Sequence, residues 1–260
     1  AFSVPASEHA VMTAYGKENE IDSFNRILDL YPTGIVSMVS DQYDLWKVLT
    51  IFLPQLKDKI MSREGKAVFR PDSGDPADIL CGLNTRKDKT FSSDEVKSPA
   101  YKGVIELLWE VFGGTTNEQG FKVLDSHVGA IYGDSITLDR VEEICDRLKE
   151  KGFASTNVVF GVGSYSMGYA TRDNQGSAVK ATYIEKEIKV SGRSLGDRKE
   201  VVGVEIFKEP VTDDGTKKSA KGLLAVFDGN LKDKCTWEEV NSDRNELKPL
   251  FKDGKLLRLT

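Results

Sequence analysis

Residues 34–41 read GIVSMVSD, a short apolar run rich in β-branched side chains that ends in an aspartate. Such a run predicts a buried strand. The apolar residues that follow, at positions 45, 48, 49, 52 and 56, recur at helical spacing and predict a helix. A strand, a polar turn and a helix together make one βα unit.

Three more strands are expected, at 67–69, 128–132 and 157–160. The prolines and glycine of 70–76 force a loop after the first of these, and 85–97 is expected to be an exposed loop. Helices are expected at 100–112 and from Leu138 onward, and Thr137 would cap the second of these. The apolar face of this second helix is expected to consist of Leu138, Val141, Ile144, Cys145 and Leu148. Strands alternating with helices predict a parallel sheet, whose ligands bind at the carboxyl ends of the strands.

The composition gives no sign of nucleic-acid binding, a membrane span or secretion. A net charge of -5 and a pI near 5.3 give no basic field for nucleic acid. No run of 18 apolar residues and no signal-peptide pattern is present, so a cytoplasmic location is expected. The three cysteines, at 81, 145 and 235, lack CxxC spacing and are expected to be free, buried thiols.

The candidates for chemistry lie where the expected strands end. His9 follows Ser7 and Glu8 and could act as a general acid or base, accept a phosphoryl group, or be structural. Three aspartates, Asp41, Asp72 and Asp134, each follow a strand. Each alone could be a cap or turn residue, but on one rim they could hold ribose hydroxyls or Mg²⁺ carrying pyrophosphate.

Two further features could contact a phosphate. Arg70 could contact a phosphate or an aromatic ring, or form a surface ion pair. The turn 161–164, with Arg172 behind it, offers backbone N–H groups that could cradle a phosphate. Its spacing matches neither the Rossmann fingerprint nor the P-loop. The second histidine, His127, is interpreted as structural.

Eight segments together resemble the nicotinamide phosphoribosyltransferases, in the same order and over nearly the whole chain. They are SVPASEH at 3–9, VSDQYD at 39–44, RPDSG at 70–74, YGD at 132–134, FGVG at 160–163, TRD at 171–173, IFKEP at 206–210 and KKSAKG at 217–222.

The resemblance implies the C-terminal part of a type II phosphoribosyltransferase α/β barrel, with some strands of an accompanying β-rich domain. Residues 1–180 would form the barrel portion, and 181–260 would complete the barrel and the β-rich domain. The implied enzyme transfers the phosphoribosyl group of 5-phosphoribosyl-1-pyrophosphate to nicotinamide in NAD salvage. ATP would phosphorylate the active-site histidine, and Mg²⁺ would accompany pyrophosphate or ATP, with no residue assigned as a metal ligand.

The resemblance also implies a role for each candidate residue. His9 would be the phosphorylated histidine, supported by Glu8 and Asp41. Ser37 and Arg70 would line the tunnel and pocket for the nicotinamide ring. The ribose would be held by Asp72, Gly133 and Asp134, and the 5-phosphate by Gly163, Ser164, Arg172 and Lys180. Ser164 departs from the family, which often has a run of glycines here.

The family polypeptide is nearly twice as long as this chain and is expected to be a homodimer. The chain opens with Ala1, and Phe2–Pro5 already reads as the end of a strand, so we expect preceding polypeptide. The N-terminal half of the family supplies an aromatic stack and an aspartate that selects the amide, so this chain alone is expected to be an incomplete enzyme. Two alternatives stay open: nicotinate phosphoribosyltransferase, and a non-catalytic fragment that needs an N-terminal partner.

Overall fold

A computed structural model describes residues 4–163, 179–192, 196–213 and 219–257, with the single positions 168 and 175. For 189–192 and 196–198 only the backbone is described. The chain divides into two compact units. The first comprises residues 1–179 and 208–218, and the second comprises 180–207 and 219–260.

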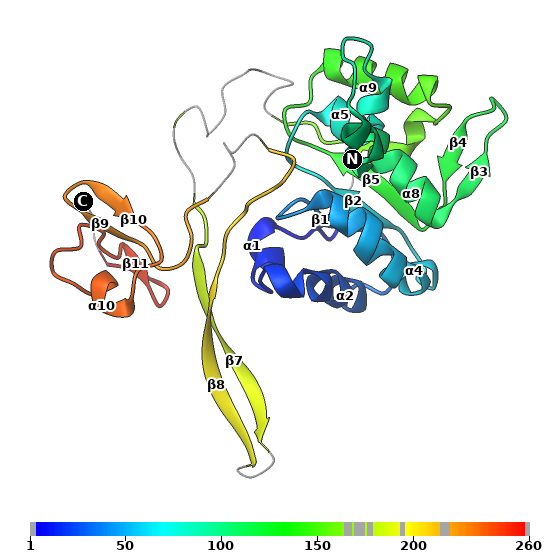
Figure 1. Ribbon diagram of the computed structural model, residues 1–260. Helices are drawn as coiled ribbons and strands as arrows, with labels where there is room; N and C mark the ends of the chain where they lie inside the picture. Colours follow the sequence, from blue (N-terminus) through cyan, green and yellow to red (C-terminus); the bar gives the residue numbers. More distant parts are fainter. Residues whose placement is uncertain are drawn as a thin grey trace. The chain divides into compact units, whose positions relative to one another are not determined.

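A four-stranded parallel sheet forms the centre of the first unit (Figure 1). Its strands, in spatial order, are β1 (Val36–Val39), β2 (Ala67–Arg70), β5 (Val128–Tyr132) and β6 (Val158–Phe160). These are the four strands expected from the sequence, with ends shifted by one or two residues. Ala6 forms a parallel bridge to Ser37, so the chain before α1 extends the sheet beyond β1.

Helices surround this sheet, and five of them, α2, α4, α8, α5 and α9, pack against one another in that order. Figure 1 shows α2 beside β1 and α8 beside β5. Their apolar faces and the strands bury one continuous core that includes Met38, Phe69 and Ala130. The helices are α1 (His9–Thr13), α2 (Glu20–Leu30), α3 (Leu45–Lys47), α4 (Leu53–Met61), α5 (Pro76–Cys81), α6 (Ser93–Lys97), α7 (Pro99–Lys102), α8 (Val104–Phe112) and α9 (Leu138–Glu150).

Short elements complete the unit. A π-helical turn, η2 (Val48–Phe52), joins α3 to α4, and single 3-10 turns lie at η1 (Lys17–Asn19), η3 (Leu83–Thr85) and η4 (Ser155–Asn157). An antiparallel hairpin is formed by β3 (Gly114–Thr116) and β4 (Lys122–Leu124).

Three local expectations were wrong. The helix expected at 100–112 is split at Gly103, whose φ of 81° ends α7, and an added Cβ there would lie 2.3 Å from the Gly82 nitrogen. The loop expected at 85–97 contains α6, because Ser92 and Glu95 form a capping box. Leu138 does not join the buried face of α9 and is 83% exposed, although Thr137 caps that helix as expected.

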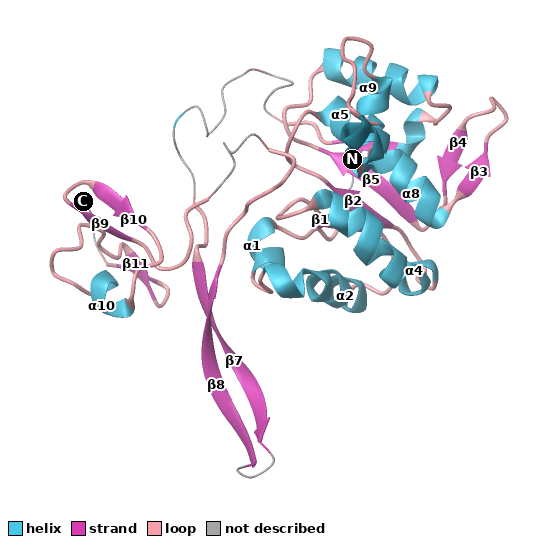
Figure 2. Ribbon diagram, in the orientation of Figure 1, coloured by secondary structure: helices cyan, strands magenta, loops and turns pink. Residues whose placement is uncertain are grey.

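The second unit consists mainly of antiparallel strand pairs (Figure 2). Its elements are β7 (Tyr183–Gly192) with β8 (Gly196–Glu205), β9 (Ala225–Phe227) with β10 (Asn230–Lys232), β11 (Phe251–Lys252) with β12 (Lys255–Leu256), and α10 (Trp237–Val240). The Tyr183 and Trp237 rings meet edge to face at 5.9 Å. The parallel sheet and its helices confirm the α/β class. The described strands of the second unit do not extend that sheet, so the closed barrel stays a prediction.

Two predictions from composition can be compared with this fold. No helix in the described parts of the chain has the length and apolarity needed to cross a bilayer. The three cysteines are free, but only Cys81 and Cys235 are buried, since Cys145 lies partly exposed on α9.

Candidate active site at the carboxyl edge of the sheet

The carboxyl ends of the parallel strands bring the predicted aspartates together. Tyr132, the last residue of β5, is buried and donates a hydrogen bond from its hydroxyl to the Gly74 carbonyl at 2.9 Å. Burial raises the pKa of Tyr132, and the surrounding carboxylates raise it further, Asp134 most of all. The others are Asp41, Asp72 and Asp75. Acidic side chains that follow β1, β2 and β5 therefore act on the same buried hydroxyl.

Glycines allow the two neighbouring loops at this edge to approach closely. The Gly161 N–H donates to the Tyr132 carbonyl at 2.8 Å. A Cβ added to Gly161 would lie 2.7 Å from the Gly133 Cα, so a side chain would separate these loops. The loop after β6 can therefore lie against the loop that carries Asp134.

His9 is placed at the same edge by the segment that precedes α1. The Ser7 N–H donates to the Ser37 carbonyl at 2.9 Å, and the Val39 N–H donates to the Ser7 hydroxyl at 3.0 Å. Because these bonds join the segment to β1, α1 begins beside the strand ends. His9 Nε2 lies 3.3 Å from Asp72 Oδ2, across 63 residues of sequence.

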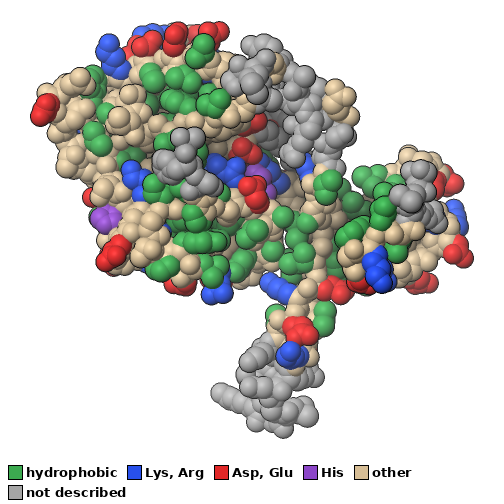
Figure 3. All heavy atoms as spheres, turned by 180° about the vertical axis from the view of Figure 1, so that it is seen from behind, with side chains coloured by type: hydrophobic (Ala, Val, Ile, Leu, Met, Phe, Trp, Pro, Cys, Tyr) green, Lys and Arg blue, Asp and Glu red, His purple; other side chains and the backbone are tan. Residues whose placement is uncertain are grey.

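Lys208 is a further member of this site, to which the sequence analysis gave no role. Its Nζ lies 3.0 Å from His9 Nε2, 3.3 Å from Asp41 Oδ2 and 3.9 Å from Asp72 Oδ2. The Lys208 side chain is 12% exposed, and Asp41 is fully buried. The segment IFKEP that contains Lys208 was one of the recognised motifs, and this was the only signal for it. Figure 3 shows a histidine among basic and acidic side chains on one face of the molecule.

The contacts of His9 require two different states of its ring. Nε2 must present a lone pair to accept a hydrogen bond from Lys208, but must carry a proton to donate to Asp72. The other ring nitrogen, Nδ1, is buried without a hydrogen-bond partner. One tautomer can satisfy only one of these two contacts.

Asp41 is held by a hydroxyl pair as well as by Lys208. The Ser73 hydroxyl donates to Asp41 Oδ2, and Ser73 Oγ lies 2.5 Å from Thr212 Oγ1. Asp41 Oδ1 is buried without a partner. Asp41 is therefore linked to His9 through Lys208, whereas Asp72 contacts His9 directly.

Arg70 lies beside the segment that carries His9. It donates to the Ser7 carbonyl at 2.8 Å and lies 3.6 Å from Glu8 Oε1, while its Nε is buried without a hydrogen-bond partner. Glu8 is exposed, and its ion pair is with Arg70. Arg70 thus holds the segment that leads into α1. Its Nε could contact a ligand at the carboxyl edge of the sheet.

The other predicted residues are distributed more widely. The Ser37 hydroxyl is buried on β1 without a hydrogen-bond partner, and Gly163 is exposed just after β6. Lys180 is exposed and belongs to the second unit. Ser164 and Arg172 lie outside the described residues.

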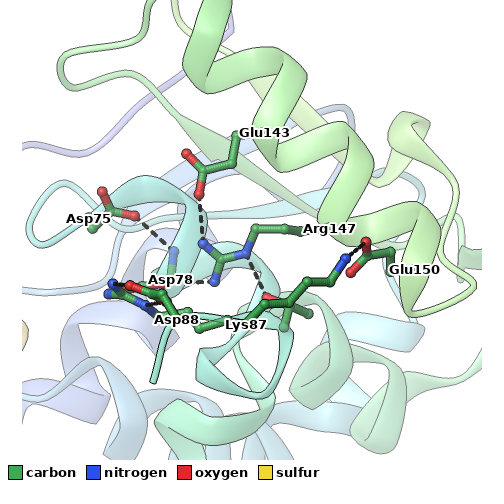
Figure 4. A pocket seen from close by; sticks show the side chains of 9 residues that line it. Asp75, Asp78, Lys87, Asp88, Glu143, Arg147 and Glu150 are labelled. Carbon is green, nitrogen blue, oxygen red and sulfur yellow. Dashed lines mark hydrogen bonds and ion pairs between the residues drawn. The ribbon is translucent and has the colours of Figure 1, made fainter. Parts of the chain in front are cut away.

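A cleft of about 400 Å³ lies elsewhere, between α5 and α9 (Figure 4). Arg147 crosses it and bonds to Asp78 at 2.7 Å and to Glu143 at 3.0 Å. The ionic side chains that line this cleft are largely paired with one another, and none of the predicted site residues lines it. We therefore place the candidate site at the carboxyl edge of the sheet. The cleft is lined by Asp75, Asp78, Thr85, Arg86, Lys87, Asp88, Glu143, Arg147 and Glu150.

Comparison with known proteins shows which family the chain belongs to. The model of the nicotinate phosphoribosyltransferase (NAPRTase) family matches residues 1–254. Three similar proteins are named nicotinamide phosphoribosyltransferase: that of Acinetobacter baylyi is 49% identical over 98% of this chain, that of Mycoplasma pneumoniae 40% over 85%, and that of Xanthomonas campestris pv. campestris 31% over 99%. These alignments cover 48%, 44% and 49% of the respective relatives, so the chain spans about half their length. The match over nearly all of its residues shows that the chain belongs to the nicotinate phosphoribosyltransferase family.

Proposed function

We propose that this chain carries the reaction site of a nicotinamide phosphoribosyltransferase that acts in NAD salvage. The observation that carries the proposal is the cluster of His9, Lys208, Asp41 and Asp72 at the carboxyl edge of a parallel sheet. The names of the similar proteins support the substrate. Since these relatives are about twice as long, we propose the activity for a protein of their full length, with a completed barrel and a homodimeric assembly.

In the proposed reaction, the ring nitrogen of nicotinamide forms a bond to the anomeric carbon of ribose. The bond from that carbon to the pyrophosphate oxygen breaks, and pyrophosphate leaves with both bonding electrons. Positive charge develops on the ribose, and the carboxylates of Asp72 and Asp134 would stabilise it while they bind the sugar with Gly133. Lys208 would balance the negative charge of the pyrophosphate.

His9 would accept a phosphoryl group from ATP. A bond forms between a ring nitrogen and the terminal phosphorus, the bond from that phosphorus to the bridging oxygen breaks, and ADP leaves. The attacking nitrogen must be unprotonated, as Nε2 is when it accepts from Lys208, and the ammonium must turn away from the lone pair before the bond to phosphorus forms. The same ammonium would then stabilise the phosphoryl oxygens.

The remaining groups complete the proposal. Ser37 and Arg70 would contact the nicotinamide ring, and Gly163, Ser164, Arg172 and Lys180 would bind the 5-phosphate. No group of three His, Cys, Asp or Glu side chains within the described ranges could hold a metal ion. We therefore assign no protein ligands to Mg²⁺, which would enter with pyrophosphate or ATP as part of the substrate.

The test measures turnover by the full-length protein with nicotinamide and with nicotinate in parallel. The Acinetobacter baylyi relative serves as the positive control, and the His9→Ala variant as the matched negative control. Product from nicotinamide alone supports the proposal, and product from nicotinate alone would replace it with the acid-specific activity.

A third arm tests the fragment alternative. The chain is assayed alone and with the part of the Acinetobacter baylyi relative that lies outside its match to this chain. Turnover only in the mixture would show that this chain needs a partner. Absence of turnover in both, while the full-length relative is active, would count against the proposal.

A further inference from the structure

Lys208 reaches the site from a segment that is neither helix nor strand, so tertiary contacts must hold it in place. Two of these are backbone hydrogen bonds. The Glu209 N–H donates to the Gln42 carbonyl at 2.9 Å. The Val211 N–H donates to the Tyr43 carbonyl at 2.8 Å. Both bonds are to the loop after β1, and neither involves the loop after β2.

A side-chain bond joins the same segment to the loop after β2. Thr212 is partly buried, and its hydroxyl oxygen lies 2.5 Å from the Ser73 hydroxyl oxygen, across 139 residues of sequence. Gly74 allows this close approach: its φ is 84°, and a Cβ added there would lie 2.7 Å from the Thr212 carbonyl oxygen. The Tyr132 hydroxyl holds the Gly74 carbonyl at 2.9 Å. Thr212 therefore contacts a loop that is itself fixed to the parallel sheet.

The direction of the bond between the two hydroxyls follows from the bond that Ser73 makes to Asp41. A serine hydroxyl has one hydrogen, and Ser73 donates it to Asp41 Oδ2. Ser73 then accepts from Thr212, so Thr212 is the donor. The same Asp41 oxygen faces the Lys208 ammonium at 3.3 Å. A directed chain of hydrogen bonds thus runs from Thr212 through Ser73 to the carboxylate that pairs with Lys208.

This chain and the backbone of the segment form a closed ring. Lys208 contacts Asp41 directly, and Thr212, which follows in the same segment, contacts Asp41 through Ser73. Removing the Thr212 hydroxyl would open the ring and leave in place every group that contacts His9. Ser73 and Asp41 are fully buried, so bulk water would not replace the lost donor.

We propose that Thr212 is a positioning residue, whose hydroxyl holds residues 208–212 against the loop after β2 and so fixes the Lys208 ammonium beside Asp41. The effect of Thr212 on turnover rests on the proposed function, whereas its hold on the segment does not. Thr212 touches none of the reacting groups, and it acts through Ser73 and through the backbone that leads back to Lys208.

The hold on the segment is measured by hydrogen exchange of the Val211 amide in this chain, without substrate. Thr212→Val removes the hydroxyl and keeps the branched shape, and it should lower the protection of this amide about fivefold, the effect of losing one ordinary hydrogen bond. Thr212→Ser keeps the hydroxyl and should retain the protection. Thr115→Val, which changes an exposed threonine of β3, is the matched control and should retain it too. Amides of β5 are the reference for a general loss of structure.

The effect on the reaction is measured with a double-mutant cycle in the full-length protein. Thr212→Val should lower kcat about fivefold and leave the KM for nicotinamide unchanged, and Thr212→Ser should restore kcat. In the Lys208→Met background, Thr212→Val should have no further effect, because no ammonium is left to be positioned. A residue that only supports the fold would lower turnover equally in both backgrounds.

The outcomes separate the two roles of Thr212 from the proposed function. If Thr212→Val retains the protection of the Val211 amide, the hydroxyl does not hold the segment. If turnover falls equally with and without Lys208, Thr212 supports the fold and does not position the ammonium. If the unchanged full-length protein has no turnover, the proposed function fails, and the exchange of the Val211 amide still decides whether Thr212 holds the segment.

Discussion

Replacing Glu20 with Gln should stabilise the protein at alkaline pH. Burial raises the pKa of Glu20 from 4.5 to about 7, so the folded state binds this proton more tightly than the unfolded state does. Glu20 therefore favours folding fully below pH 4.5, and this contribution is lost as pH rises through about 7. A difference of that size corresponds to about 3 kcal/mol at full ionisation. Glutamine keeps the shape of the neutral acid and does not ionise.

The assay is urea denaturation of both proteins at pH 5, 6, 7 and 8. The free energy of unfolding of Glu20→Gln, minus that of the unchanged protein, should grow by about 2 kcal/mol from pH 5 to pH 8. Asp22→Asn controls for the loss of one negative charge and should show no such growth. A difference that stays constant, or that shrinks toward pH 8, would refute the reasoning that Glu20 ionises at a cost in the folded protein.

Three predictions concern the site in the full-length protein. His9→Ala should abolish the stimulation by ATP and lower turnover by at least about 100-fold, and a stimulation that persists would remove His9 from the mechanism. Lys208→Met should lower turnover by about 100-fold, whereas Lys57→Met, which changes an exposed lysine, should have no effect; equal activity of the two variants would exclude Lys208. Asp72→Asn and Asp134→Asn should raise the KM for the phosphoribosyl substrate far more than that for nicotinamide, and an equal loss for both would indicate a folding defect.

The convergence of the candidate residues at one edge could be predicted because two simple regularities coincide. Short β-branched runs predicted the strands that end at Val39 and Tyr132, and these strands are parallel. Parallel strands place their carboxyl ends at one edge, so the residues that follow them must converge. The pKa of Tyr132 reflects this convergence, since aspartates from three separate loops raise it.

Lys208 could not be placed in the same way. It contacts His9 across 199 residues of sequence, and it does so from a segment that is neither helix nor strand. Periodicity carries no information about such a segment, whose position depends on backbone hydrogen bonds to Gln42 and Tyr43. The break at Gly103 was missed for a related reason: it depends on the close approach of Gly82, which is distant in sequence.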